Sequence, residues 1–482
     1  MRGSILSVCA LASATYASHV VLPRTPSTPL YGNASATDLF SCAAASWPQS
    51  DVGVPLTPQP VDRELVELLS EIDPARIGAY IAKLVSFGTR HTLSVQNSTT
   101  RGIGAARDWI AQEMRSFAAT SEGRMTVSVP GYIQGLEARV PFPVLISNVV
   151  ARIEGSTDPT RVYVISGHYD SRATDPNDYT SDAPGANDDA SGVAVVLEIA
   201  RILATRQPKA TILLGAVAGE EQGLYGSNFW AQTLRNASVN VEGVLNNDIV
   251  GSSTGDRGQR DPYTIRVFAQ GLPPTESAAR RAQRLTIGGE NDSPARQLAR
   301  FSVEVAANNA TGMNIAIIYR LDRYLRGGDH RSFLEAGYSA VRYTEPNEDY
   351  AHQHQDVRVE NGTQYGDLIE FVDFEYVARV AKVNLATLWS IANAPGQVRN
   401  ATVNATLLSN DSQFSWLRSN DTDIEGYEVV WRPTAAPLWT HVVDVGLVNT
   451  VTLPLSKDNV IFGIRSRGRN GYRSPAVLPF PG

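Results

Sequence analysis

The chain alternates short strand-like apolar runs with helical ones from about Asp62 to Ala394, and this alternation constrains its fold most strongly. Runs such as RVYVISGH and ATILLGAVAG have the length and composition of buried strands, whereas SGVAVVLEIARILA has the length of a helix. Strands interleaved with helices favour a parallel sheet that helices cover on both faces. The expected fold class is α/β, with a mainly parallel mixed sheet sandwiched by helices.

The sequence changes character after Ala394. Short β-rich runs and turns replace the alternation, and Trp416 lies in one of these runs, where it suits the core of a sandwich. A chain of 482 residues with 43% hydrophobic residues is also too long for one ordinary core. We therefore expect two folded units, an α/β domain at 61–394 and a small all-β immunoglobulin-like sandwich at 395–482.

The first eighteen residues have the pattern of a secretory signal. Arg2 is followed by the apolar run Ile5–Ala14, and the small residues Ala17 and Ser18 suit a signal peptidase. This run is too short to span a bilayer, and no later run approaches the roughly 20 residues that a membrane helix needs. We expect residues 1–18 to be a signal peptide, with a mature N-terminal helix as the alternative, and we expect no membrane span.

Residues 19–60 are rich in Pro, Ser, Thr and Ala without periodicity, which predicts a flexible leader. Ten Asn-x-Ser/Thr acceptors support secretion to the extracellular space and predict N-linked glycans. They are Asn33, Asn97, Asn236, Asn291, Asn309, Asn361, Asn400, Asn404, Asn410 and Asn420. The formal net charge of −7 and the absence of a long basic run argue against a nucleic-acid partner.

Acidic residues and one histidine follow successive apolar runs. They occur in GHYDS, GANDDASG, GEEQG and NNDIVG, where open parallel sheets present their chemistry. One imidazole with several carboxylates and no cysteine suits a hydrolytic zinc centre, because structural zinc sites usually contain thiolates. The candidates are His168, Asp188, Glu220, Glu221 and Asp248.

The local sequence suggests a role for each neighbour of these residues. Asp170 is two residues beyond His168 and can orient a metal-bound ring. Asp188 precedes a predicted helix and can bridge two cations, although Asp189 is the competing assignment. Glu220 and Glu221 are adjacent, so their side chains point in different directions, one to a metal and one above it as a general base. His330 and His352 are the candidates for completing a second metal position.

Taken together, the segments GHYDS, GANDDASG, GEEQGLYGS, NNDIVG, GGDHRSF and HQHQD resemble the co-catalytic di-zinc aminopeptidases of peptidase family M28. The resemblance covers roughly Asp62 to Ala394. Separately, WLRSNDTDIEGYEVVWRPT and IRSRGRNGYRS resemble a fibronectin type III domain. The first resemblance implies a zinc exopeptidase fold for the larger domain.

The aminopeptidase resemblance also implies a role for each candidate residue. One zinc ion would be held by His168, Asp188 and Asp248, and a second by Asp188, Glu221 and His352. His352 is preferred to His354 because Asp356 follows it by four residues, as in the family's H-x-x-x-D pattern. Glu220 would be the general base and Asp170 would support the ligands from behind.

The resemblance implies a secreted zinc aminopeptidase with two Zn²⁺ ions per chain. It would hydrolyse N-terminal residues from peptides or proteins through a metal-bridging hydroxide. The chain departs from some relatives at Ala351, where they have a tyrosine that stabilises the oxyanion, and Tyr350 is shifted by one position. His330 keeps a glutaminyl-cyclase-like enzyme as an alternative, and a non-catalytic receptor-like glycoprotein is another.

Overall fold

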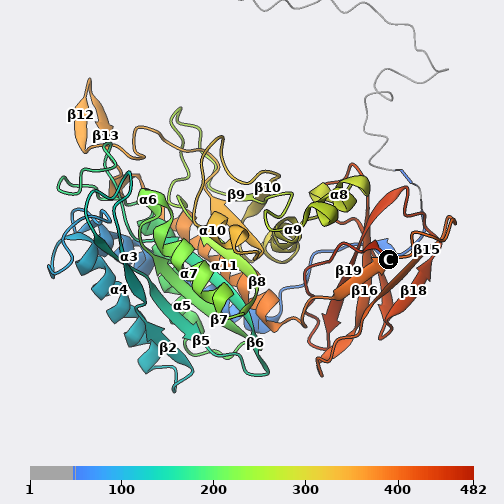
Figure 1. The fold of residues 1–482 in the computed structure, drawn as a ribbon. Helices are drawn as coiled ribbons and strands as arrows, with labels where there is room; N and C mark the ends of the chain where they lie inside the picture. Colours follow the sequence, from blue (N-terminus) through green and yellow to red (C-terminus); the bar gives the residue numbers. More distant parts are fainter. Residues whose placement is uncertain (1–46, 49) are drawn as a thin grey trace, which may run out of the picture. The chain divides into compact units, whose positions relative to one another are not determined.

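The computed structural model describes residues 47–48 and 50–482 (Figure 1). The predicted signal peptide and most of the predicted leader lie outside the described residues. The end of the leader, expected to be flexible, instead contributes the short strand β1 (Val54–Pro55), which pairs antiparallel with β17 (His441–Gly446). A two-residue strand leaves no periodicity in the sequence, and a proline is tolerated on an edge strand.

An eight-stranded mixed sheet forms the centre of the larger domain, in the order β10-β9-β11-β8-β6-β7-β5-β2. The central strands β11, β8, β6 and β7 are mutually parallel. At one end β5 runs antiparallel to β7, and β2 runs antiparallel to β5. The strands are β2 (Met125–Ser128), β5 (Val149–Ile153), β6 (Asp158–His168), β7 (Ala210–Val217), β8 (Asn240–Asn247), β9 (Thr264–Phe268), β10 (Asn314–Ile318) and β11 (Ala340–Thr344).

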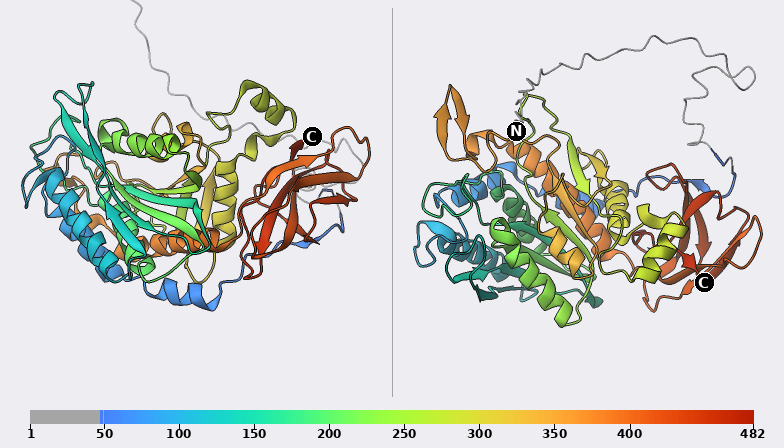
Figure 2. Two further views of the ribbon diagram at one scale, coloured as in Figure 1. Left: turned by 60° about the horizontal axis from the view of Figure 1, so that its bottom comes forward. Right: turned by 45° about the horizontal axis from the view of Figure 1, so that its top comes forward.

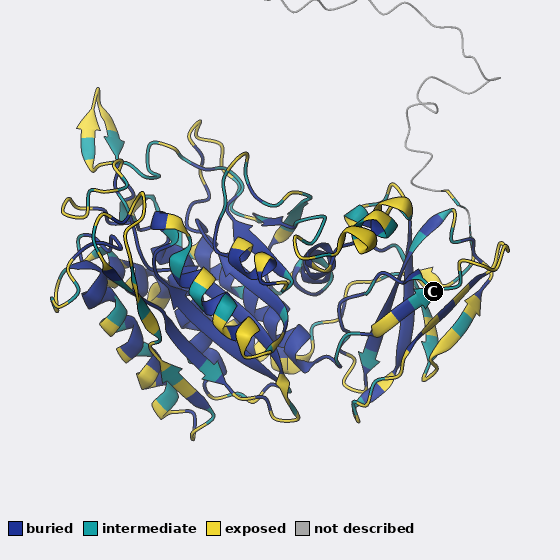
Figure 3. Ribbon diagram, viewed as in Figure 1, coloured by how far each residue is buried: buried dark blue, intermediate teal, exposed yellow. Residues whose placement is uncertain are grey.

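Helices cover both faces of this sheet because successive side chains of a strand point to opposite faces. In β6, Tyr163 and Ile165 belong to one apolar core, and Val162 and Val164 belong to the other. The first core includes α2 (Arg63–Ser70), α3 (Pro74–Val85), α4 (Gly102–Ala119), α5 (Ala190–Leu203), α9 (Pro294–Ala306) and α11 (Phe374–Asn393). The second includes α7 (Tyr225–Asn236) and α10 (His330–Glu335). Figures 2 and 3 show this layering and the buried sheet, and the α/β fold class is confirmed.

The C-terminal residues form two four-stranded sheets that share one apolar core. The sheet orders are β1-β17-β16-β19 and β18-β15-β14-β20, and Trp416, Tyr427, Trp431 and Phe462 are buried between them. The strands are β14 (Arg399–Val403), β15 (Ser412–Leu417), β16 (Ile424–Pro433), β18 (Thr450–Leu453), β19 (Val460–Gly468) and β20 (Phe480–Pro481). The chain therefore ends in an all-β sandwich, and Trp416 lies in its core as predicted.

The change from α/β to β structure falls between α11 and β14, close to the predicted boundary at 394/395. Residues 48–482 nevertheless form one compact unit. Buried ion pairs join the sandwich to the larger domain: Arg432 Nη2 lies 2.7 Å from Asp292 Oδ2, and Arg465 Nη1 lies 2.7 Å from Glu304 Oε2. Among the described residues, no helix is both long and apolar enough to cross a membrane.

Several elements were not predicted from the sequence. These include α9 and α10, the hairpin of β3 (Gly131–Gln134) and β4 (Val144–Ser147), and the hairpin of β12 (Arg358–Glu360) and β13 (Thr363–Tyr365). The short helix α8 (Ala278–Thr286) lies between β9 and α9. Ser293 caps α9 and Pro294 occupies its first turn, which is a recognisable helix start.

Candidate metal centre

The carboxyl ends of neighbouring parallel strands bring the predicted residues together. His168 is the last residue of β6, Asp248 directly follows β8, and α6 (Glu220–Gly223) begins three residues after β7 ends. Because β8, β6 and β7 are adjacent and parallel, these side chains meet at one edge of the sheet. Asp188 reaches the same place from the loop that precedes α5.

The first cluster consists of His168, Asp188 and Asp248. Nε2 of His168 lies 3.1 Å from Oδ1 of Asp188 and 3.8 Å from Oδ1 of Asp248. All three residues are buried. Burial opposes protonation of His168, but the surrounding carboxylates of Asp170, Asp188 and Asp248 raise its pKa well above the usual value. The cluster therefore strongly favours a positive charge in its midst.

The second cluster shares Asp188 and adds Glu221 and His354. Nε2 of His354 lies 2.9 Å from Oδ2 of Asp188 and 2.8 Å from Oε1 of Glu221. Asp188 thus directs one carboxylate oxygen to each histidine. Oε1 of Glu221 is buried, and its short contact with His354 does not have the geometry of a hydrogen bond, an arrangement that a metal ion between the two atoms would satisfy.

The prediction of His352 at this position is wrong, because the structure brings His354 there instead. Nδ1 of His352 faces Asp349 at 3.2 Å, and its ring stacks on Phe371 with 3.6 Å between centroids. Asp356, on which the choice of His352 rested, accepts a hydrogen bond from the backbone N–H of Thr174. In a loop without regular structure, sequence spacing does not determine where a side chain points.

The structure distinguishes Asp188 from its neighbour Asp189. Asp189 caps α5 and is fully buried: Oδ1 accepts from the N–H groups of Gly192 and Ile249, and Oδ2 accepts from that of His168. Its two oxygens are therefore engaged by the backbone. Asp188 alone of the pair faces both histidines.

Asp170 lies directly behind the two clusters. Its Oδ1 is 3.5 Å from Nδ1 of His168, and its Oδ2 accepts hydrogen bonds from Thr92 Oγ1 and from the N–H of Glu221. These contacts fix both the imidazole and the start of α6. Burial opposes the charge of Asp170, but its hydrogen bonds lower its pKa below the usual value.

Residues that the sequence analysis missed support the clusters from outside. Nη2 of Arg342, in β11, lies 2.8 Å from Oδ1 of Asp248, and its side chain is fully buried. Asp367 accepts hydrogen bonds from the N–H groups of Asn187 and Asp188, which holds the loop before α5. An arginine inside the apolar run SAVRYTE was a usable signal, because buried arginines are rare without a charged partner.

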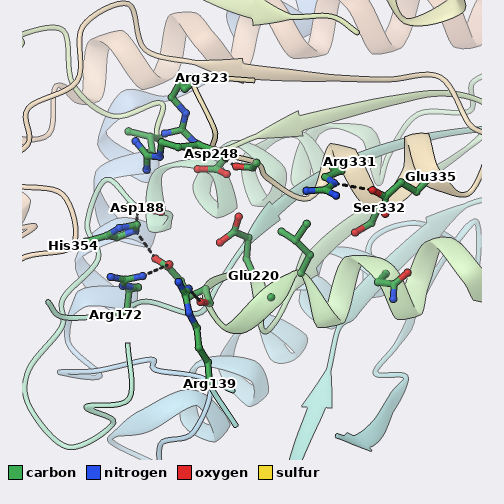
Figure 4. A pocket seen from close by; sticks show the side chains of 17 residues that line it. Arg139, Arg172, Asp188, Glu220, Asp248, Arg323, Arg331, Ser332, Glu335 and His354 are labelled. Carbon is green, nitrogen blue, oxygen red and sulfur yellow. Dashed lines mark hydrogen bonds and ion pairs between the residues drawn. The ribbon is translucent and has the colours of Figure 1, made fainter. Parts of the chain in front are cut away.

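Glu220 belongs to neither cluster and lines an adjoining cavity of about 540 Å³ (Figure 4). The same cavity is lined by Asp188, Glu221, Asp248 and His354. Burial and the nearby charges of Asp248 and Glu221 raise the pKa of Glu220 well above its usual value. A half-buried carboxylate beside the clusters, with no ligand position in them, suits proton transfer.

His330 is in neither cluster. Its Nε2 lies 2.9 Å from the backbone oxygen of Leu321, and the side chain is buried in the first turn of α10. The position therefore gives no support to a centre that uses His330 as a ligand.

The donor set fits zinc. Each cluster combines one imidazole with two carboxylates, all are convergent, and the ligand atoms of each lie within 4.8 Å of one another. Nitrogen and carboxylate ligands with an open side are typical of hydrolytic zinc sites, and the open side here is the cavity.

The chain is similar to several known proteins. A model described as peptidase family M28 matches residues 148–368. A probable zinc metalloprotease from Pyrenophora tritici-repentis is 68% identical over 456 residues, 94% of each chain. Another, from Pyricularia oryzae, is 61% identical over the full length of both chains. The crystal structure of LapB from Legionella pneumophila is 20% identical and covers 70% of this chain and 77% of that one, with a TM-score of 0.49.

Proposed function

Because this chain belongs to peptidase family M28 and is a zinc metallopeptidase, we propose that it is an aminopeptidase, which removes residues from the free N-termini of peptides and proteins. The observation that carries the proposal is the position of Asp188 between two histidine-containing clusters, with Glu220 outside both and facing the cavity. Two ligand sets that share a carboxylate are suited to two ions, and Glu220 is left for acid–base chemistry.

Two zinc ions per chain are part of this proposal. His168, Asp188 and Asp248 would hold one ion, and Asp188, Glu221 and His354 would hold the other. Zinc would supply polarisation of the scissile carbonyl and a lowered pKa of water. A free α-amine could also bind at such a centre, whereas an acetylated nitrogen could not, which supports the proposed preference for a free N-terminus.

The chain's own residues perform the proton transfers. Glu220 accepts a proton from the attacking water at its carboxylate and donates it to the nitrogen of the leaving group. Asp170 is a positioning residue: it holds the imidazole of His168 and the backbone of Glu221 through the contacts described above.

The proposal extends to where the protein works. We propose that it is secreted through residues 1–18, carries N-linked glycans, and ends in a fibronectin type III-like domain. Of the nine acceptor asparagines in the described part of the chain, all but Asn404 are exposed, which supports glycosylation. The two four-stranded sheets of the sandwich support the comparison with fibronectin type III.

The test compares an unblocked peptide with its N-acetylated twin, using the purified zinc-loaded protein and mass spectrometry of the products. Stepwise loss of N-terminal residues from the free peptide alone, abolished by chelator and restored by zinc, is the expected result. Internal cuts in both peptides would show an endopeptidase. Loss of ammonia from an N-terminal glutamine without cleavage would show a cyclase, and no product from a metal-loaded sample would favour a receptor-like protein.

A further inference from the structure

The cavity beside the metal clusters is unusually rich in arginine. Five arginines line it together with five carboxylates: Arg139, Arg172, Arg323, Arg326 and Arg331, with Asp188, Glu220, Glu221, Asp248 and Glu335. Three of these carboxylates belong to the two clusters. Two divalent cations would offset the clusters' negative charge, so the arginines leave the zinc-loaded cavity with a strong positive potential.

Three of the five arginines already have a carboxylate partner. Arg323 and Arg326 both pair with Oε2 of Glu348, at 3.1 and 2.9 Å, and Arg331 pairs with Glu335 at 2.7 Å. Arg323 has a second partner in Oδ1 of Asp322 at 2.9 Å, whereas the pair of Arg331 with Glu335 is half-exposed. Each of the three guanidinium groups is thus already engaged by at least one carboxylate of the protein.

Arg139 and Arg172 differ from the other three. Arg139 donates from Nη1 to the backbone oxygen of Glu221 at 2.8 Å and forms no ion pair with a described residue. The nearest carboxylate to Arg172 is that of Glu221, at 3.8 Å from Nη1, although only 14% of the Arg172 side chain is exposed. Glu221 is itself a ligand in the proposed zinc centre, so neither arginine has a carboxylate of its own.

We infer that Arg139 and Arg172 recognise a carboxylate of the substrate peptide, next to the bond that is cut. A guanidinium presents several N–H donors in a fixed plane that matches a carboxylate. Arg172 is shielded and has no counter-ion of its own, which is costly until an anion arrives, whereas Arg139 is exposed and adds a second guanidinium at the same place. Both arginines touch Glu221, at the edge of the second cluster (Figure 4). One extended residue spans only about 3.5 Å, so the carboxylate belongs to a residue flanking the cleaved bond.

Three sources of such a carboxylate are possible, and matched peptide pairs distinguish them. In the first pair, one peptide begins with Asp and its neutral twin begins with Asn. In the second pair, the second residue is Glu in one peptide and Gln in the other. These four peptides have amidated C-termini. The third compares a dipeptide acid with its amide. In one of these pairs, the charged member is expected to be cleaved with a kcat/KM about tenfold or more above that of its neutral twin.

Variants assign this preference to the two arginines. Arg139→Met and Arg172→Met keep an apolar stem but remove the charge. Each is expected to reduce the ratio of kcat/KM for the charged peptide to kcat/KM for its neutral twin severalfold. Arg172→Lys keeps the charge without the planar donors and is expected to retain part of the ratio. Arg331→Met is the matched control, because Arg331 lines the same cavity but pairs with Glu335, and its ratio should equal that of the wild type.

The inference rests on the proposed aminopeptidase function, and a binding measurement separates the two. Glutarate, a small dicarboxylate, is titrated calorimetrically into the zinc-loaded wild type and each variant. Weakening of about tenfold in Arg172→Met or Arg139→Met but not in Arg331→Met supports carboxylate recognition even if no peptide is cleaved. Equal glutarate affinity in the wild type and all the variants, or cleavage without any preference for the charged twin, would overturn the inference while leaving the aminopeptidase proposal intact.

Discussion

At the scale of single residues, Glu220 and Glu221 show how adjacent carboxylates acquire different tasks. Both follow the buried strand β7, but Glu221 meets His354 at 2.8 Å, whereas Glu220 belongs to neither cluster. The backbone N–H of Glu221 donates to Asp170, and this contact fixes the direction in which α6 starts. The direction of the backbone at the start of α6 thus makes one of these adjacent residues a candidate metal ligand and the other a candidate proton acceptor.

Replacing Glu220 with Gln tests this separation. Glu220→Gln is expected to lower kcat by roughly 10²–10⁴-fold, because it removes the proton acceptor, while binding as much zinc as the wild type. Peptide turnover and elemental analysis measure the two quantities. Glu335→Gln is the control, because Glu335 lines the same cavity and lies outside both clusters. Full turnover in Glu220→Gln would contradict the assignment.

The choice between His354 and His352 gives a second prediction. His354→Ala is expected to weaken the binding of one of the two zinc ions. Loss of a residue that only supports a ligand lowers metal affinity roughly 10–100-fold, and loss of a ligand should lower it further. His352→Ala removes only the stacking on Phe371 and the contact with Asp349, so both ions should stay bound. Titration against a competing zinc chelator compares the variants. The reverse order of affinities would restore His352 as the ligand.

These residues also show what sequence can and cannot predict about the site. Ligands at strand ends, such as His168 and Asp248, are predictable because the apolar run before each one fixes where the strand ends. His354 follows β11 by ten residues in an irregular segment, and no periodicity indicates its direction. The charge of Arg342 inside a run of β-forming residues indicates that it needs a partner, but no local pattern indicates that the partner is Asp248.

At the scale of elements, the start of α5 is where fold and site are joined. Asp189 caps the helix and also accepts hydrogen bonds from backbone N–H groups of β6 and of the segment after β8. One buried carboxylate therefore fixes the relative position of three elements whose ends carry the clusters. Sequence analysis identified the helix itself, but its spacing could not show which of the two aspartates caps it.

Asp189→Ala is expected to destabilise the metal-free protein by several kcal/mol. The substitution leaves three N–H groups without an acceptor, and each buried unsatisfied group costs about 1–3 kcal/mol. Asp189→Asn keeps an oxygen for the N–H groups of Gly192 and Ile249 but sets its NH₂ group against the N–H of His168, so it should cost less than the alanine variant but more than nothing. Urea unfolding in the presence of a chelator measures the difference. Equal stability of the alanine variant and the wild type would show that these contacts do not hold the three elements.

At the scale of the whole molecule, sequence predicted two folded units but not how closely they are joined. The alternation of strands and helices, and its end near residue 394, were visible because they depend on local patterns. Asp292 joins the sandwich to the larger domain. It accepts hydrogen bonds from Arg300 at 2.9 Å and from Arg432 at 2.7 Å, and both arginines are buried. Partners 140 residues apart cannot be paired from sequence alone.

Asp292→Ala tests whether the sandwich and the larger domain are held together by this carboxylate. The variant leaves two buried guanidinium groups unpaired, and breaking a buried ion pair in this way costs roughly 3–5 kcal/mol. Trp439, one of seven tryptophans in the chain, lies 5.6 Å from the guanidinium groups of both Arg300 and Arg432, so it contributes a signal from this contact to the total fluorescence. Urea unfolding followed by tryptophan fluorescence should show a lower midpoint for Asp292→Ala, whereas Asp411→Ala, at an exposed position of the sandwich, should unfold like the wild type. An unchanged midpoint in Asp292→Ala would mean that the apolar contacts alone hold the two parts together, and the buried charges would then serve only to fix their orientation.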